Sequence, residues 1–104
     1  MTSDKANLWV DMISPMAEKY GDIIARYHRK GHLAHVEIIS GKLNKLQIVV
    51  DDGDRDEIRV YSYDKPYYDV RHIARVDMPL CDPSFDPAEI IATIERTLIE
   101  IKNA

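Results

Sequence analysis

Apolar residues recur at helical spacing through the first third of the chain. From Trp9 to Tyr27 they fall every third or fourth position, as in a helix with one buried face: Trp9, Ile13, Met16, Tyr20, Ile23, Ile24 and Tyr27. Pro15 lies inside this stretch and predicts a kink or a helix that restarts with Ser14 as its cap. Gly31, which follows several basic residues, predicts the end of the helix.

The middle of the chain instead alternates apolar and polar residues with a period of two, which is typical of strands with one buried face. Three such runs cover residues 34–38, 46–50 and 58–61, and glycine-containing turns join them. The alternation predicts a fourth strand over residues 68–78. Its expected buried face carries Val70, His72, Ala74, Val76 and Met78, and its exposed face carries Asp69, Arg71, Arg75 and Asp77.

The last segment has a complete helix-start signal. Asp86 is an expected N-cap, Pro87 suits the first helical position, and Glu89 completes a capping box. Phe85 and Ile90 are spaced to form a hydrophobic staple across this start. The apolar stripe that follows consists of Ile90, Ile91, Ile94, Leu98 and Ile101. The opposite side of the helix is charged, with Glu95, Arg96, Glu100 and Lys102.

These elements predict an α+β fold in the order α-β-β-β-β-α, with both helices on one face of a four-stranded antiparallel sheet. The 104 residues, 45% hydrophobic and 31% charged, fit a single domain covering residues 1–104. No apolar run is long enough to span a bilayer, and the first residues do not read as a signal peptide. Cys81 is the only cysteine, so an internal disulfide is impossible and a cytoplasmic protein is expected.

The net charge of −4 arises within one segment, residues 51–69, since the rest of the chain holds eleven acids and eleven bases. Within this segment the acids are Asp51, Asp52, Asp54, Asp56, Glu57, Asp64 and Asp69, and the bases are Arg55, Arg59 and Lys65. Such a region repels nucleic acid and attracts basic proteins. A solvated hairpin turn is the simpler interpretation of the same charges.

Known metal-site patterns fit the acidic turn poorly. Counted from Asp52, the sixth and twelfth positions of a calcium loop hold Glu57 and Tyr63 instead of glycine and glutamate. A magnesium nuclease would use acids such as Asp51 or Asp52 with Glu57 and a nearby lysine, for which Arg59 is a poor substitute. No cofactor or metal is therefore expected.

The histidines and the cysteine do not indicate catalysis either. His28, His32 and His35 match no zinc spacing and are expected to be surface groups near a helix end. Cys81 with His72 lacks the setting of an activated thiol, because adjacent carboxylates raise a thiol pKa. We expect no catalytic residue, although an enzyme remains an alternative.

One stretch combines tyrosines with aspartates, which is typical of a protein-binding surface. Four tyrosines and two aspartates fall within residues 61–69: Tyr61, Tyr63, Asp64, Tyr67, Tyr68 and Asp69. If Ile58 and Val60 face the core, Tyr61 and Tyr63 point to the sheet face that no helix covers. Ordinary packing of these rings is the alternative. The predicted partner-binding residues are these six together with Asp52, Asp54 and Asp56.

The segment from Asp64 through Lys65, Pro66, Tyr67 and Tyr68 to Asp69 resembles in character the surface that bacterial immunity proteins present to nuclease toxins. The compact acidic chain as a whole is similar to contact-dependent growth inhibition immunity proteins. This resemblance implies a cytoplasmic inhibitor whose carboxylates take the place of substrate phosphates in a basic toxin's cleft, with tyrosines as anchors. Two alternatives remain: an adaptor or chaperone for a secreted protein, using exposed apolar helix surface, and a divergent enzyme acting through Asp52, Glu57 and His72.

Overall fold

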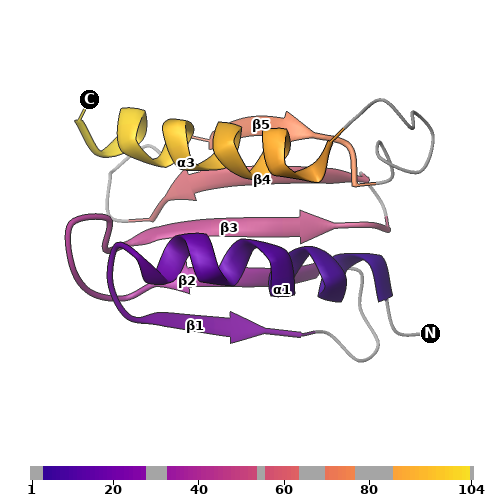
Figure 1. The fold of residues 1–104 in the computed structure, drawn as a ribbon, viewed down its shortest axis with the longest axis horizontal. Coiled ribbons are helices and arrows are strands. Elements are labelled where there is room, and N and C mark those ends of the chain that lie inside the picture. The colour runs from indigo at the N-terminus through magenta and orange to yellow at the C-terminus, as the bar shows by residue number, and fades with distance from the viewer. Residues whose placement is uncertain (1–3, 28–32, 54–55, 64–69, 77–85, 104) are drawn as a thin grey trace.

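A computed structural model describes residues 4–27, 33–53, 56–63, 70–76 and 86–103 of the chain. The elements are α1 (Asp4–Glu18), β1 (Ile23–Arg26), β2 (Leu33–Ile38), β3 (Leu46–Asp51), β4 (Glu57–Ser62), β5 (Val70–Ala74) and α3 (Pro87–Asn103). The five strands pair antiparallel in sequence order, from β1 at one edge to β5 at the other (Figure 1). The α+β class is confirmed, with one strand more than the sequence predicted.

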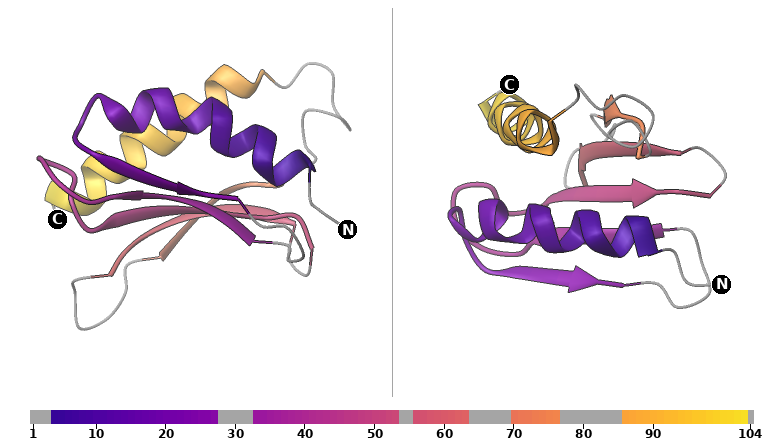
Figure 2. Two further views of the ribbon diagram at one scale, coloured as in Figure 1. Left: turned by 90° about the horizontal axis from the view of Figure 1, so that it is seen from below. Right: turned by 45° about the vertical axis from the view of Figure 1, so that its right-hand side comes forward.

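The two described helices lie on the same face of the sheet, and none of the described residues forms a helix on the opposite face (Figure 2). We call the uncovered side the helix-free face. On the covered side, alternate residues of β2, β3 and β4 are fully buried against the helices: Ala34, Val36, Ile38, Leu46, Ile48, Val50, Ile58 and Val60. α1 packs across β2 with contacts to β1 and β3, and α3 packs across β4 and β5. This arrangement is the two-layer packing that the alternation predicted.

The extra strand, β1, corrects the prediction of one helix from Trp9 to Tyr27. The helix ends at Glu18, and Gly21 follows with φ of +154°, a conformation that side chains rarely adopt. A Cβ at Gly21 would lie 2.0 Å from the carbonyl oxygen of Ser40, so the turn before β1 packs directly on the turn after β2. Gly31, the predicted helix end, lies outside the described residues.

Pro15 neither restarts nor ends the first helix. It lies inside the continuous α1, and the Ser14 hydroxyl donates to the carbonyl of Val10 at 2.7 Å instead of capping a new turn. The expected restart at Ser14 is therefore wrong. The neighbouring side chains show what holds α1 in place: Ile13 and Met16 are buried in the core. The stabilisation from burying these apolar side chains outweighs the loss of the one backbone hydrogen bond that a proline removes.

The last strand is shorter than predicted, and part of it faces the other way. A register shift between Ile58 and Arg59 places His72 opposite Arg59 on the helix-free face. Arg71, predicted to be on the wet face, lies opposite Val60 on the covered side, 3.6 Å from Glu100 of α3. The bulge explains the error, because an extra residue reverses which side chains face the core. Met78 and Asp77 lie outside the described residues.

The final helix begins as the sequence predicted. Asp86 accepts a hydrogen bond from the amide of Ala88 at 3.0 Å, and Ile90 and Leu98 of the apolar stripe are buried. The partner predicted for Ile90 in the staple, Phe85, lies outside the described residues. Among the described residues, no helix is long and apolar enough to cross a membrane.

Candidate binding face

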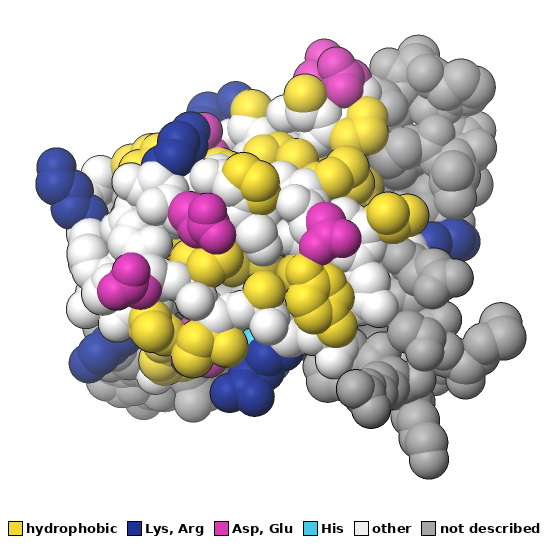
Figure 3. Space-filling model, turned by 60° about the horizontal axis from the view of Figure 1, so that its bottom comes forward, with side chains coloured by type: hydrophobic (Ala, Val, Ile, Leu, Met, Phe, Trp, Pro, Cys, Tyr) yellow, Lys and Arg dark blue, Asp and Glu magenta, His cyan; other side chains and the backbone are white. Residues whose placement is uncertain are grey.

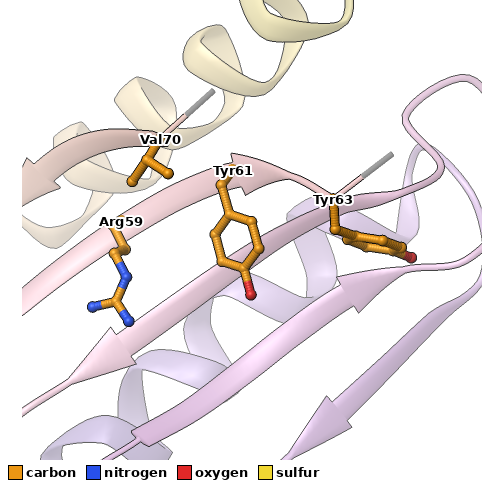
Figure 4. Close-up of a pocket in the computed structure, with 4 residues that line it drawn as sticks. All are labelled: Arg59, Tyr61, Tyr63 and Val70. Atoms are coloured by element: carbon orange, nitrogen blue, oxygen red, sulfur yellow. The ribbon is translucent and has the colours of Figure 1, made fainter. Parts of the chain in front are cut away.

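Strand β4 supplies the central side chains of the helix-free face. Ile58 and Val60 are fully buried on the covered side, so the alternating residues Arg59 and Tyr61 point away from the helices, as Figure 4 shows. Tyr63, one residue beyond the strand, projects from the same face, and its amide donates to the carbonyl of Lys45 at 3.1 Å. The predicted orientation of Tyr61 and Tyr63 is confirmed.

A chain of charged groups crosses this face from β3 to β5. Arg59 donates to Glu57 with 3.1 Å between Nη1 and Oε1, and the same nitrogen lies 3.8 Å from a carboxylate oxygen of Asp51. The other oxygen of Glu57 lies 2.7 Å from Nδ1 of His72. Two carboxylates thus share one guanidinium and one imidazole, so the cluster keeps a net negative charge when His72 is neutral.

Beside this cluster lies a hollow of about 410 Å³, lined by Arg59, Tyr61, Tyr63 and Val70 among the described residues (Figure 4). We call it the tyrosine hollow. The Tyr61 hydroxyl donates to the side-chain oxygen of Gln47 on β3, which fixes the ring across the strand pair. Val70 is opposite Tyr61 on β5 and remains 43% exposed, so the hollow has an apolar wall. Aromatic and apolar walls around a charged group are typical of binding sites.

The acidic turn after β3 is partly structural. The Asp51 side chain is only 8% exposed, and it accepts a hydrogen bond from the amide of Gly53 at 3.0 Å. Asp56 pairs with Arg75, whose Nε and Nη2 atoms both lie 3.1 Å from one carboxylate oxygen. Asp52 is partly exposed. The turn therefore presents less free negative charge than the count of its acids indicates.

Only part of the predicted binding surface can be placed. Tyr61 and Tyr63 come together at the tyrosine hollow, and Asp52 and Asp56 lie at the turn between β3 and β4. The other five predicted residues lie outside the described residues: Asp54, Asp64, Tyr67, Tyr68 and Asp69. Cys81, His28 and His32 also lie outside them.

The structure brings together two of the three residues considered for an enzyme. Glu57 and His72 meet on the helix-free face, whereas Asp52 lies in the turn that follows the end of β3. His72 was expected on the apolar face and instead stands 60% exposed on the helix-free face. In the described part of the chain, no three His, Cys, Asp or Glu side chains are grouped to hold a metal ion.

Sequence reasoning missed Arg59, Gln47 and Val70 as parts of the site. Arg59 could have been found, because the period that turns Tyr61 away from the core also turns Arg59 away. Val70 could not, because its orientation depends on the bulge opposite β4. Comparison with protein families, with curated proteins and with solved structures finds no match.

Proposed function

We propose that this protein is a binding module that inhibits a basic protein, in the manner of an immunity protein acting on a nuclease toxin. The observation that carries the proposal is the tyrosine hollow, because Tyr61, Tyr63 and Val70 offer aromatic and apolar contact area on a face that neither helix covers. Large rigid side chains of this kind dominate the binding energy of protein interfaces.

The hollow is suited to a protein partner because part of it is already ordered. The ring of Tyr61 is held by its hydrogen bond to Gln47, and the guanidinium of Arg59 is held by Glu57. Binding therefore immobilises fewer free side chains, and this lowers the entropic cost of association. A volume of about 410 Å³ has room for one or two side chains of a partner.

Charge favours a basic partner. The whole chain carries −4, and the cluster of Asp51, Glu57, Arg59 and His72 on this face is net negative when His72 is neutral. Lysine or arginine side chains around a nuclease cleft would meet carboxylates where they normally meet phosphates. The inhibitor would thus close the cleft without any chemistry of its own.

The test is binding to, and inhibition of, a partner captured from the native cell. The wild-type chain should capture a basic nuclease and inhibit its cleavage of nucleic acid at a one-to-one ratio. Tyr63→Ala should raise the dissociation rate by about 30-fold, which corresponds to about 2 kcal/mol at a hot spot. The matched control is Ile99→Ala, which truncates a partly exposed side chain on α3 and should leave binding unchanged.

Circular dichroism of both variants checks that the domain remains folded. Capture of a non-basic protein, or binding that survives Tyr63→Ala and is lost with Ile99→Ala, would refute the proposal. The second result would favour an adaptor that uses the exposed apolar residues of the helices, of which Leu8 is 60% and Met12 38% exposed.

A divergent enzyme is the second candidate, and the contact between His72 and Glu57 favours it. A carboxylate 2.7 Å from Nδ1 orients an imidazole so that Nε2 can act as a base. The replacement His72→Gln separates the two functions. It should abolish turnover in an enzyme, whereas an inhibitor should keep its stoichiometric effect on the captured nuclease.

A further inference from the structure

The outer edge of β1 is the second surface with a specific complementarity. β1 is the first strand of the sheet, and no described element lies beyond it (Figure 1). Its outer backbone groups are therefore available for pairing with another strand. Strand edges of this kind are common sites of association between chains.

The hydrogen bonds around β1 show which residues point outward. The amide of Ile39 donates to the carbonyl of Asp22 at 2.9 Å, so Asp22 directs its backbone toward β2. In an antiparallel pair this direction alternates from residue to residue. The backbone N–H and C=O groups of Ile24 and Arg26 therefore also point toward β2, while those of Ile23 and Ala25 point outward. The amide of Lys45 donates to the carbonyl of Ile38 at 2.8 Å, so Ile38 directs this carbonyl away from β1. Ile38 lies opposite Ile23, which agrees with backbone groups of Ile23 that face outward.

We infer that β1 pairs antiparallel with β1 of a second copy of this chain, in the register that places Ile24 opposite the Ile24 of that copy. Residues whose backbone groups face outward must lie opposite one another to exchange hydrogen bonds. This requirement allows twofold registers centred on Ile23, Ile24 or Ala25. Only the register centred on Ile24 brings Asp22 opposite Arg26 of the second copy, and symmetry makes this pair twice. Both side chains are exposed and lie on the helix-free face.

In this register Ile23 of each copy exchanges two backbone hydrogen bonds with Ala25 of the other, which gives four across the axis. Ile24 and the two Asp22–Arg26 pairs occupy non-hydrogen-bonded positions, where opposing Cα atoms are only about 4.5 Å apart and side chains meet closely. The edge therefore complements itself in backbone, apolar and charged groups at once.

The described surroundings of β1 leave room for the second strand. α1 packs mainly over β2, one strand inside the edge, so it does not cover the outer side of β1. Figure 3, which looks toward this edge, shows hydrophobic side chains spread among acidic and basic ones. Tyr27, at the end of β1, is 49% exposed, and its hydroxyl donates to Asp11 of α1 at 2.5 Å. That bond ties the end of the edge to the helix layer.

The interface has a short strand, so we expect a weak dimer with a dissociation constant of about 10 µM to 1 mM. Sedimentation equilibrium of the full chain across that range should show a monomer–dimer equilibrium that weakens as salt screens the ion pairs. A chain that stays monomeric throughout refutes the inference. The measurement needs no binding partner, so it stands apart from the proposed function.

A charge swap tests the register. Asp22→Arg and Arg26→Asp should each weaken self-association by at least about tenfold, because each puts like charges opposite one another twice. An equimolar mixture of the two variants should dimerise again, because each introduced charge then faces an opposite charge on the other chain. In the mixed dimer, one ion pair joins the two introduced side chains, and the other joins the unchanged Arg26 of one chain to the unchanged Asp22 of the other.

Lys42→Asp, in an exposed turn after β2, is the control with the same change in charge as Arg26→Asp. If the mixture fails to recover, or the control weakens equally, the register is wrong.

Cross-linking checks the centre of the interface independently. In a Cys81→Ser background, Ile24→Cys should form a disulfide-linked dimer, because opposing Cα atoms about 4.5 Å apart fall within disulfide geometry. Ile99→Cys is the control, because this partly exposed residue lies on α3, far from β1. Equal rates of cross-linking for the two variants would mean that β1 is not the interface.

Discussion

Acidic and tyrosine side chains of this protein differ widely in role, although the sequence presents them as similar. Asp51 is buried and holds the turn after β3, and Glu95 of α3 contacts Lys19 and Tyr20 in the turn after α1. Tyr20 thus serves the helix layer, while Tyr63 lines the tyrosine hollow. Neighbours from distant parts of the sequence determine which role each side chain has. Counts of residue types alone therefore do not predict these roles.

Glu95 should make stability depend on pH. Its carboxylate lies 2.8 Å from Nζ of Lys19 and accepts a hydrogen bond from Tyr20, and both contacts hold its pKa below the ordinary value of 4.5. A lowered pKa means that the unfolded chain binds the proton first, so this stabilisation is present above about pH 4.5 and is lost as pH falls through the folded-state pKa.

Urea unfolding of the wild type and of Glu95→Gln at a series of pH values measures the effect. The wild type should be the more stable near neutral pH, and the difference should shrink in acid. Tyr20→Phe removes one of the two contacts and should show a smaller change of the same sign. A difference that does not vary with pH would mean that solvent screens this carboxylate fully.

Gly21 should be intolerant of any side chain. Its φ of +154° and the backbone oxygen of Ser40, 2.0 Å from where a Cβ would lie, leave no space. Gly21→Ala should therefore destabilise the protein by about 1–3 kcal/mol or more in urea unfolding. Ser40→Ala removes only the hydroxyl that accepts from the amide of Asp22, so it should cost about 0.5–1.5 kcal/mol. Equal costs would argue against strain at Gly21.

At the scale of elements, capping chemistry was more informative than periodicity. Asp86 and Pro87 predicted the start of α3 correctly, because these residues act on their own local backbone. The period of the first segment misled, because Ile23 and Ile24 fit a helix as well as a strand. The decisive feature is the contact between Gly21 and Ser40, which are far apart in sequence. The reversed face of β5 depends on a bulge, so the sequence pattern did not predict it either.

The cap of α3 should contribute measurably to stability. Asp86→Ala leaves the amide of Ala88 without its acceptor and should lower the free energy of unfolding by about 0.5–2 kcal/mol. Equilibrium unfolding in urea measures it as a shift in midpoint at constant slope. An unchanged midpoint would contradict the cap.

Truncating a buried side chain of the apolar stripe of α3 should lower the free energy of unfolding more than removing the cap does. Leu98 is fully buried, so Leu98→Ala opens a cavity and should cost about 2–5 kcal/mol. The adjacent Ile99 is 37% exposed, and Ile99→Ala should cost far less, about 0.5 kcal/mol. Thermal unfolding of the two variants compares neighbouring side chains of the same helix. Similar losses would mean that the stripe is not the core face.

For the whole molecule, the sequence predicted the class, the helix layer and the helix-free face, because periodic apolar positions mark the helices and strands along most of the chain. It predicted the orientation of Tyr61 and Tyr63 from the expected burial of Ile58 and Val60. The hollow itself required three strands in register, with Gln47 and Val70 brought beside Tyr61. Register is a property of strand pairs, so no single segment contains it.

The two proposed surfaces lie on opposite halves of the sheet, and this predicts how they combine. The tyrosine hollow is built on β4 and β5, whereas self-association uses β1 at the far edge. A twofold axis normal to the sheet would place both hollows on the same side of a continuous sheet formed by the two copies. The two β4 strands would then be about seven strand spacings apart, or about 34 Å before twist.

That separation leaves each hollow open to its own partner, so the dimer should bind two partner molecules. Native mass spectrometry of the disulfide-linked Ile24→Cys dimer with the captured partner should give a two-to-two complex. Each site should have the affinity of the monomer, because neither surface shares a residue with the other. A two-to-one complex would show that one partner spans both halves, and a dimer that binds no partner would show that the β1 edge itself belongs to the binding surface.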